Sequence, residues 1–214
     1  MERVRQLVNS ANPVKWLFIG DSITHGAFHT FGWRDYVELF AERVRWERGR
    51  GADVVINTAV SGNTTRDLLD KFDWRVKQFH PDAVFIMIGM NDCSECQVGL
   101  DEFEGNISRL LEAVLDGGAV PVLQTTCPIR IGGAPDREPN LGAYMDVIRR
   151  LAVMRRLPLI DHERFWRERM THSTYWMSDA IHPNEYGHRG FAECLLRELG
   201  IFDPASQTCR LHIP

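Results

Sequence analysis

The stretch WLFIGDSIT, residues Trp16–Thr24, decides the fold and places a reactive side chain within it. Its apolar half, Trp16–Ile19, has the length and composition of a short strand that is buried on both faces. Gly20 permits a tight turn after that strand. Asp21 and Ser22 then stand where a helix would begin. The Ser22 hydroxyl and backbone N–H are therefore predicted to face one point above the sheet edge, where negative charge could be held.

Three more motifs follow in an order that could complete a site around a nucleophilic serine: AVSGN (59–63), IGMND (88–92) and DAIH (179–182). Each motif alone is weak evidence. Gly-Asp-Ser is often only a turn that caps a helix, Gly62 could be a turn glycine, and Asn91 could cap a helix. His182, beside a proline, could be an ordinary loop residue. The combination is more specific, because three of the four motifs directly follow predicted strands.

Predicted strands alternate with helix-length segments along the whole chain. The strands are short, continuous and apolar, as is typical of parallel strands covered on both faces: Lys15–Ile19, Val54–Asn57, Ala83–Ile88, Val120–Gln124 and Leu157–Ile160. Apolar positions of helical period predict helices over Trp33–Arg48, Asp101–Leu115, Leu141–Met154 and Gly187–Leu199. We therefore predict an α/β fold: one flavodoxin-like doubly wound domain over residues 1–214, whose five-stranded parallel sheet has the order 2-1-3-4-5 and helices on both faces.

This strand order would bring the distant motifs together. Ligands of open parallel sheets bind beyond the carboxyl ends of the strands, where the strand order reverses. Ser22, Gly62 and Asn91 follow the first three strands and would converge there. The three-residue spacing lets Asp179 accept a hydrogen bond from His182 Nδ1, which leaves Nε2 free to take the serine proton.

Three segments lack a periodic pattern. Residues 128–140, rich in glycine and proline, are expected to form a loop at the mouth of the site. Residues 172–183 carry the DAIH motif. The C-terminal tail, residues 203–214, could pack on a partner subunit, as in a homo-oligomer, or fold back on its own chain.

Composition excludes several classes of partner. The formal net charge is −4 and hydrophobic residues make up 44%, so nothing indicates binding to nucleic acid or an anionic membrane. The N-terminus has no apolar run typical of a secretory signal, and no stretch is long enough to cross a membrane. Five scattered cysteines fit reduced thiols, so we predict a cytoplasmic protein. The pair Cys93 and Cys96 lacks the setting of a zinc or redox site, and we interpret it as incidental.

Together the four motifs resemble those of the SGNH (GDSL) hydrolases, and the resemblance extends from Trp16 to about Leu199. It implies that Ser22 is the nucleophile and that Asp179 and His182 are the acid and base of a triad. It also implies an oxyanion hole formed by the Ser22 N–H, the Gly62 N–H and the Asn91 side chain. One departure is that the first motif continues Ser-Ile-Thr rather than Ser-Leu, which leaves the chemistry unchanged.

Within that family, the segments VSGNT (60–64), IMIGMND (86–92), HP (182–183) and GH (187–188) are most similar to the intracellular carbohydrate acetylesterases, which include enzymes acting on xylan and xylo-oligosaccharides. The resemblance implies a serine esterase that removes acetyl or other short acyl groups from a small-molecule or oligosaccharide ester. It implies neither a cofactor nor a metal.

The substrate-binding residues are less well defined. Aromatic and histidine side chains, His25, Phe28, His29, Phe31 and Trp33, follow the nucleophile, and Tyr175 and Trp176 precede the acid–base pair. We expect Trp33, Trp176, Met90 and Asp21 to contact substrate, although Asp21 and Asp92 also suit loop-holding roles. Aromatic rings suit stacking on a sugar, but they suit an acyl chain or a core position equally well.

Three other functions compete with this interpretation. A lysophospholipase or thioesterase would share the triad but accept longer acyl chains; the absence of a long apolar lid argues mildly against it. A non-catalytic binding protein on a hydrolase fold would require a lost catalytic residue, and none is missing. A receiver domain with Asp21 as phosphoacceptor would need an acidic cluster and a later lysine, and it leaves His182 unexplained.

Overall fold

The computed structural model describes residues 1–169 and 174–214. Its core is a five-stranded sheet in the order β2-β1-β3-β4-β5, in which every neighbouring pair is parallel. The strands are β1 (Lys15–Gly20), β2 (Val54–Asn57), β3 (Ala83–Met87), β4 (Val120–Gln124) and β5 (Leu159–Ile160). The predicted α/β class, strand direction and strand order are confirmed.

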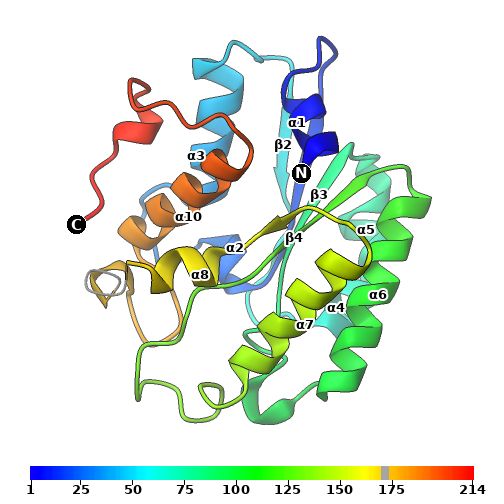
Figure 1. Ribbon diagram of the computed structural model, residues 1–214, viewed down its shortest axis with the longest axis vertical. Coiled ribbons are helices and arrows are strands. Elements are labelled where there is room, and N and C mark those ends of the chain that lie inside the picture. Colours follow the sequence, from blue (N-terminus) through cyan, green and yellow to red (C-terminus); the bar gives the residue numbers. More distant parts are fainter. Residues whose placement is uncertain (170–173) are drawn as a thin grey trace.

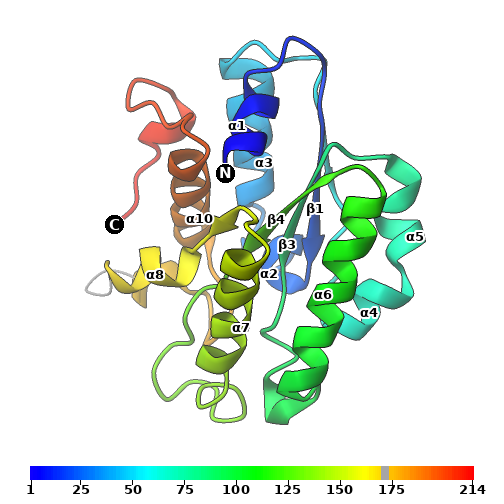
Figure 2. The same cartoon turned by 45° about the vertical axis from the view of Figure 1, so that its right-hand side comes forward.

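Helices cover both faces of this sheet (Figures 1 and 2). On one side α3 packs against α10, and on the other side α6 lies between α4 and α7. The α-helices of the described residues are α1 (Glu2–Val8), α2 (Ser22–His25), α3 (Tyr36–Ala41), α4 (Thr65–Asp70), α5 (Phe72–Arg75), α6 (Leu100–Asp116), α7 (Leu141–Met154), α8 (His162–Arg167) and α10 (Glu185–Glu198). The described residues also form the π-helix η1 (Glu42–Glu47) and short 3₁₀ turns: η2 (Lys77–Phe79), η3 (Ser94–Cys96), η4 (Thr174–Trp176) and η5 (Thr208–Arg210).

Local capping sets helix boundaries that periodicity missed. The helix predicted over Trp33–Arg48 begins only at Tyr36, because the Asp35 carboxylate accepts hydrogen bonds from two N–H groups of the first turn. From Glu42 it continues as the π-helix η1. The helix predicted from Gly187 begins earlier, at Glu185, because the Asn184 side chain caps it.

The middle strands form the centre of the core. Every residue of β3 is buried, as are the residues of β1 after Lys15. Phe18 of β1 stacks on Phe85 of β3, with ring centroids 4.4 Å apart. Burial on both faces explains why these strands read as continuous apolar runs.

The C-terminal tail folds back on its own chain. The Trp176 indole N–H donates to the Pro214 carbonyl at 3.0 Å, and Arg189 donates to the His212 carbonyl at 2.8 Å. The hydroxyl of Thr208, a residue of the tail, donates to Glu47 of η1 at 2.9 Å. The tail could pack on a partner subunit or fold back on its own chain, and these contacts match the second of these roles.

All five cysteines are free thiols; Cys93 is buried, whereas Cys96 is exposed. Among the helices of residues 1–169 and 174–214, none has both the length and the apolar character that a membrane span requires.

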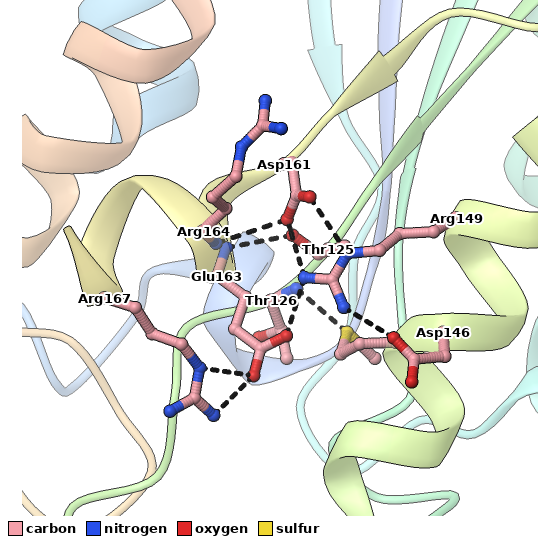
Figure 3. A network of polar contacts seen from close by, with 9 residues as sticks. Thr125, Thr126, Asp146, Arg149, Asp161, Glu163, Arg164 and Arg167 are labelled. Atoms are coloured by element: carbon pink, nitrogen blue, oxygen red, sulfur yellow. Dashed lines mark hydrogen bonds and ion pairs between the residues drawn. The ribbon is translucent and has the colours of Figure 1, made fainter.

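A buried ion-pair cluster joins α7 to the segment after β5 (Figure 3). The Arg149 guanidinium donates to both carboxylate oxygens of Asp161, at 2.9 and 2.8 Å, and to Glu163 at 2.8 Å. The Asp161 and Glu163 side chains are only 9% and 4% exposed. Asp161 also accepts the Thr125 hydroxyl at 3.0 Å and the Arg164 N–H at 3.2 Å, which begins α8. Arg149 is therefore shared by two buried carboxylates at the end of the sheet, and Glu163 is also paired with Arg167 of α8 at 2.7 Å.

Replacing this arginine should destabilise the fold. Arg149→Met leaves the buried Asp161 without its cation and leaves Glu163 with Arg167 alone, and we expect the free energy of unfolding to fall by about 3 kcal/mol in urea denaturation at pH 7. Arg150→Met is the matched control, because the adjacent Arg150 makes an exposed pair with Glu104. The control should change stability by less than about 1 kcal/mol. Equal losses in the two variants would contradict a special role for Arg149.

The same cluster predicts a pH dependence. Burial alone would raise the pKa of Asp161, but the Arg149 guanidinium outweighs it and holds that pKa below its ordinary value. A lowered folded-state pKa stabilises the fold above the ordinary carboxyl value of about 4, and this contribution is lost as the pH falls through the lowered value. The stability gap between wild type and Arg149→Met should therefore narrow in acid.

Candidate active site

The nucleophile candidate stands at the junction of β1 and α2. A Cβ at Gly20 would collide with the Met87 carbonyl, so only glycine lets β1 turn here beside β3. The Asp21 carboxylate then accepts the Ile23 N–H at 2.9 Å and caps α2. Ser22 is thereby fixed as the first residue of the helix. Its backbone N–H has no hydrogen-bond acceptor among the described residues.

A continuous chain of hydrogen bonds connects the serine to the DAIH motif. Ser22 Oγ lies 2.9 Å from His182 Nε2, and His182 Nδ1 lies 2.8 Å from Asp179 Oδ2. The other Asp179 oxygen accepts the backbone N–H groups of Ile181 and His182, at 2.9 and 2.8 Å. The carboxylate therefore holds both the imidazole and the loop that carries it. The structure thus brings Ser22, His182 and Asp179 together.

These contacts also set the charge of the carboxylate. Partial burial alone would raise the pKa of Asp179, but the Ile181 N–H and the His182 side chain and N–H outweigh it, so its pKa lies below the ordinary value. Asp179 is an anion at neutral pH and suits the stabilisation of an imidazolium.

Gly62 and Asn91 occupy the loops after β2 and β3. Gly62 has φ +84°, a conformation that favours glycine, and a Cβ there would meet open space. Within the described part of the chain, nothing accepts a hydrogen bond from the Gly62 N–H. The Asn91 side-chain amide donates to the Asn63 carbonyl at 2.9 Å, which orients the amide and leaves its second proton for another acceptor.

Asp92 has a structural role. Its buried carboxylate accepts the Thr65 N–H at 2.9 Å and the Thr65 hydroxyl at 2.6 Å. Asn106 of α6 donates to the same hydroxyl at 3.0 Å. These bonds tie the loop after β3 to the first residue of α4, and they match the loop-holding role expected of Asp92.

The structure does not bring most of the expected substrate-binding residues to an open surface. Trp176 is only 2% exposed, because its ring packs edge-on against Trp166 and lies over Gly190. Met90 and Asp21 are each 1% exposed. Burial also raises the pKa of Asp21 to about 7. Side chains packed in this way have almost no surface left to offer a ligand.

Trp33 is exposed but lies elsewhere. It lines a hollow of about 340 Å³ whose other walls include Leu39 of α3, Arg189 of α10 and Leu211 of the tail. Ser22 and His182 are not among the described residues that line this hollow.

The segment expected at the mouth of the site contacts the acid–base loop. The Arg130 N–H donates to the Ala180 carbonyl at 2.9 Å, and a Cβ at Gly133 would touch Ala180. Residues 128–140 therefore lie directly beside the loop of Asp179 and His182. Of the irregular stretch 172–183, residues 172 and 173 lie outside the described residues.

One site residue had no assigned role in the sequence interpretation. The His29 ring stacks on the His182 ring, with centroids 3.5 Å apart and planes 4° from parallel. His29 Nδ1 also lies 3.6 Å from Asp179 Oδ2. The sequence places His29 in an aromatic cluster near the nucleophile, but no spacing rule indicates which ring of that cluster meets His182.

Comparisons with known proteins identify the family. Residues 18–189 match the GDSL-like lipase/acylhydrolase family. The chain is 29% identical over 208 residues to the acetylxylan esterase of Geobacillus stearothermophilus, covering 87% of this chain and 94% of that protein. It is also 29% identical over 161 residues to an arylesterase of Vibrio mimicus, covering 70% and 72% of the two chains.

Among solved structures, the Geobacillus acetylxylan esterase Axe2 superposes with a TM-score of 0.76 at 27% identity, covering 91% of this chain and 97% of Axe2. Catalytic mutants of Axe2 replace a serine, an aspartate and a histidine, the last two being three positions apart in that protein. The serine, the three-residue aspartate–histidine spacing and the family match lead to one conclusion: the chain belongs to the GDSL-like lipase/acylhydrolase family of SGNH hydrolases and is a carboxylic ester hydrolase.

Proposed function

We propose that this chain hydrolyses short acyl esters through an acyl-serine intermediate on Ser22. Its preferred substrates are acetyl esters of carbohydrate hydroxyls. The observation that carries the proposal is the unbroken hydrogen-bond chain from Ser22 through His182 to Asp179. His182 takes the Ser22 proton as the hydroxyl attacks the ester carbonyl. The resulting imidazolium then protonates the departing alcohol, and water repeats the cycle on the acyl-serine.

The proposed oxyanion hole has three donors. The Ser22 and Gly62 N–H groups are free of acceptors in the described structure, and the Asn91 amide keeps one proton after bonding the Asn63 carbonyl. All three would hold the negative oxygen of the tetrahedral intermediate. None of the proposed steps uses a metal or an organic cofactor.

The substrate class rests on similarity and on what lies near the triad. One relative, similar over 87% of this chain and 94% of its own length, is an acetylxylan esterase. Phe28, beside His29, is 86% exposed and offers a ring on which a sugar could stack.

We further propose that residues 1–214 form one domain. We also propose a cytoplasmic location, in keeping with five free thiols.

Acyl-chain preference tests the substrate proposal. We expect kcat/KM for p-nitrophenyl esters to fall beyond butyrate, because a short acyl pocket makes a longer chain clash or stay in water. We also expect release of acetate from peracetylated xylose and acetylated xylo-oligosaccharides. A lipid groove predicts the opposite slope, since each buried methylene adds about 0.8 kcal/mol of binding.

The Ser22→Ala protein, purified in parallel, controls for contaminating esterases in both assays. A kcat/KM that climbs through octanoate, with no acetate released from any acetylated sugar, would overturn the carbohydrate proposal in favour of a lysophospholipase or thioesterase.

Similarity to the Vibrio mimicus protein favours a second candidate, the hydrolysis of aryl esters. The two candidates differ in the alcohol that leaves. If the protein hydrolyses phenyl acetate efficiently but leaves acetylated xylo-oligosaccharides intact, aryl esters are its preferred class of substrate.

A further inference from the structure

His182 is held unevenly by its two hydrogen-bond partners. On one edge it meets Ser22, whose proton it must take, and on the other it meets Asp179, whose side chain is 47% exposed. Water reaches a carboxylate exposed to this degree and competes for its oxygens, so the hydrogen bond from His182 to Asp179 is not shielded from solvent. The face of the ring is covered much better, since His29 lies parallel to it at 3.5 Å.

We propose that His29 is a positioning residue of this esterase, which keeps the His182 ring in its productive plane and stabilises its charged form. The inference rests on the proposed function. His29 makes no contact with the Ser22 hydroxyl; it stacks on His182, and its Nδ1 lies 3.6 Å from Asp179 Oδ2, so it would act through the acid–base pair.

The charge state of His29 suits this role. Burial, and after it the neighbouring His182, lower the pKa of His29, so its ring is neutral at neutral pH. The flat face of a neutral aromatic ring attracts a cation placed above it. His182 becomes such a cation only once it has taken the serine proton. The stack therefore favours the charged transition state over the resting state, which is the condition for raising kcat.

The stacked geometry also argues against a metal site at this position. The His29, Asp179 and His182 ligand atoms lie within 4.8 Å of one another, a spacing that a metal could bridge. However, lone pairs on imidazole nitrogens lie in the ring plane, and two rings 4° from parallel direct them alongside each other rather than at one point. Stacking explains the arrangement better.

Two substitutions separate stacking from other roles. His29→Ala removes the ring, and we expect kcat for p-nitrophenyl acetate to fall about tenfold with KM changed less than twofold. His29→Phe keeps a flat ring over His182 without its nitrogens, and it should recover most of the lost kcat. Labelling of Ser22 by an organophosphonate should be slower in His29→Ala and recover in His29→Phe, because it depends on the same proton transfer.

His212→Ala, which removes an exposed histidine of the tail, is the matched control and should retain wild-type kcat. Thermal unfolding of each variant distinguishes a local effect from loss of the fold. A kcat for His29→Ala within twofold of wild type, or a His29→Phe protein no better than His29→Ala, would overturn the inference. If the wild-type protein itself fails to hydrolyse the ester, the proposed function fails instead.

Discussion

Ser22→Ala is expected to lower kcat for p-nitrophenyl acetate by roughly 10³-fold or more, while circular dichroism and the unfolding midpoint stay those of the wild type. The alanine lacks the oxygen that attacks the carbonyl, but it keeps the backbone N–H and the helix start. Asp21, which caps α2 through its own carboxylate, remains in place. The loss should therefore appear in the chemistry and not in the fold.

A variant that folds and still turns over ester at near wild-type rates would reject Ser22 as the nucleophile. Thr24→Ser, two residues along the same helix, is the matched control. Thr24 is buried and its hydroxyl lies 3.1 Å from Tyr36 Oη, so the smaller serine can keep that bond. Its kcat should stay close to that of the wild type.

Asn91→Ala is expected to cost about 10²–10³-fold in kcat with a smaller change in KM. The amide would donate to an oxygen that becomes fully negative only in the transition state, so its removal affects the rate more than ground-state binding. Kinetics on p-nitrophenyl acetate, with kcat and KM determined separately, give the measurement.

The Asn91 amide also holds the Asn63 carbonyl, so a structural effect must be separated from a chemical one. The unfolding midpoint and the rate of organophosphonate labelling should be measured on the same sample. A rise in KM alone would make Asn91 a substrate-binding residue and contradict the oxyanion role.

The sheet could be predicted from sequence because its strands are buried on both faces. A continuous apolar run such as Ala83–Met87 carries a signal that needs no knowledge of its neighbours. Short helices lacked such a signal: α5 (Phe72–Arg75) is about one turn long, which is too short to show a period. The change to a π-helix at Glu42 leaves no mark in the spacing of apolar residues.

The active site also combines features that the sequence predicts with features that it does not. Chain topology brings Ser22 and His182 together, and local spacing joins Asp179 to His182, so motif order and spacing sufficed to predict that meeting. Side-chain direction is set by tertiary packing instead. Trp176 lies three residues from Asp179 in sequence, yet it points into the core against Trp166. The contact of His29 with His182 likewise depends on how the loop after α2 folds.

The most direct test of the central claim is to locate the covalent acyl intermediate. The protein is mixed with p-nitrophenyl acetate, quenched in acid within the first turnover and digested, and the peptides are mapped by mass spectrometry. Our account predicts an added acetyl group on the peptide that contains Ser22, at that residue, and none in Ser22→Ala. An acetyl group found only on another residue, together with unchanged turnover in Ser22→Ala, would contradict it.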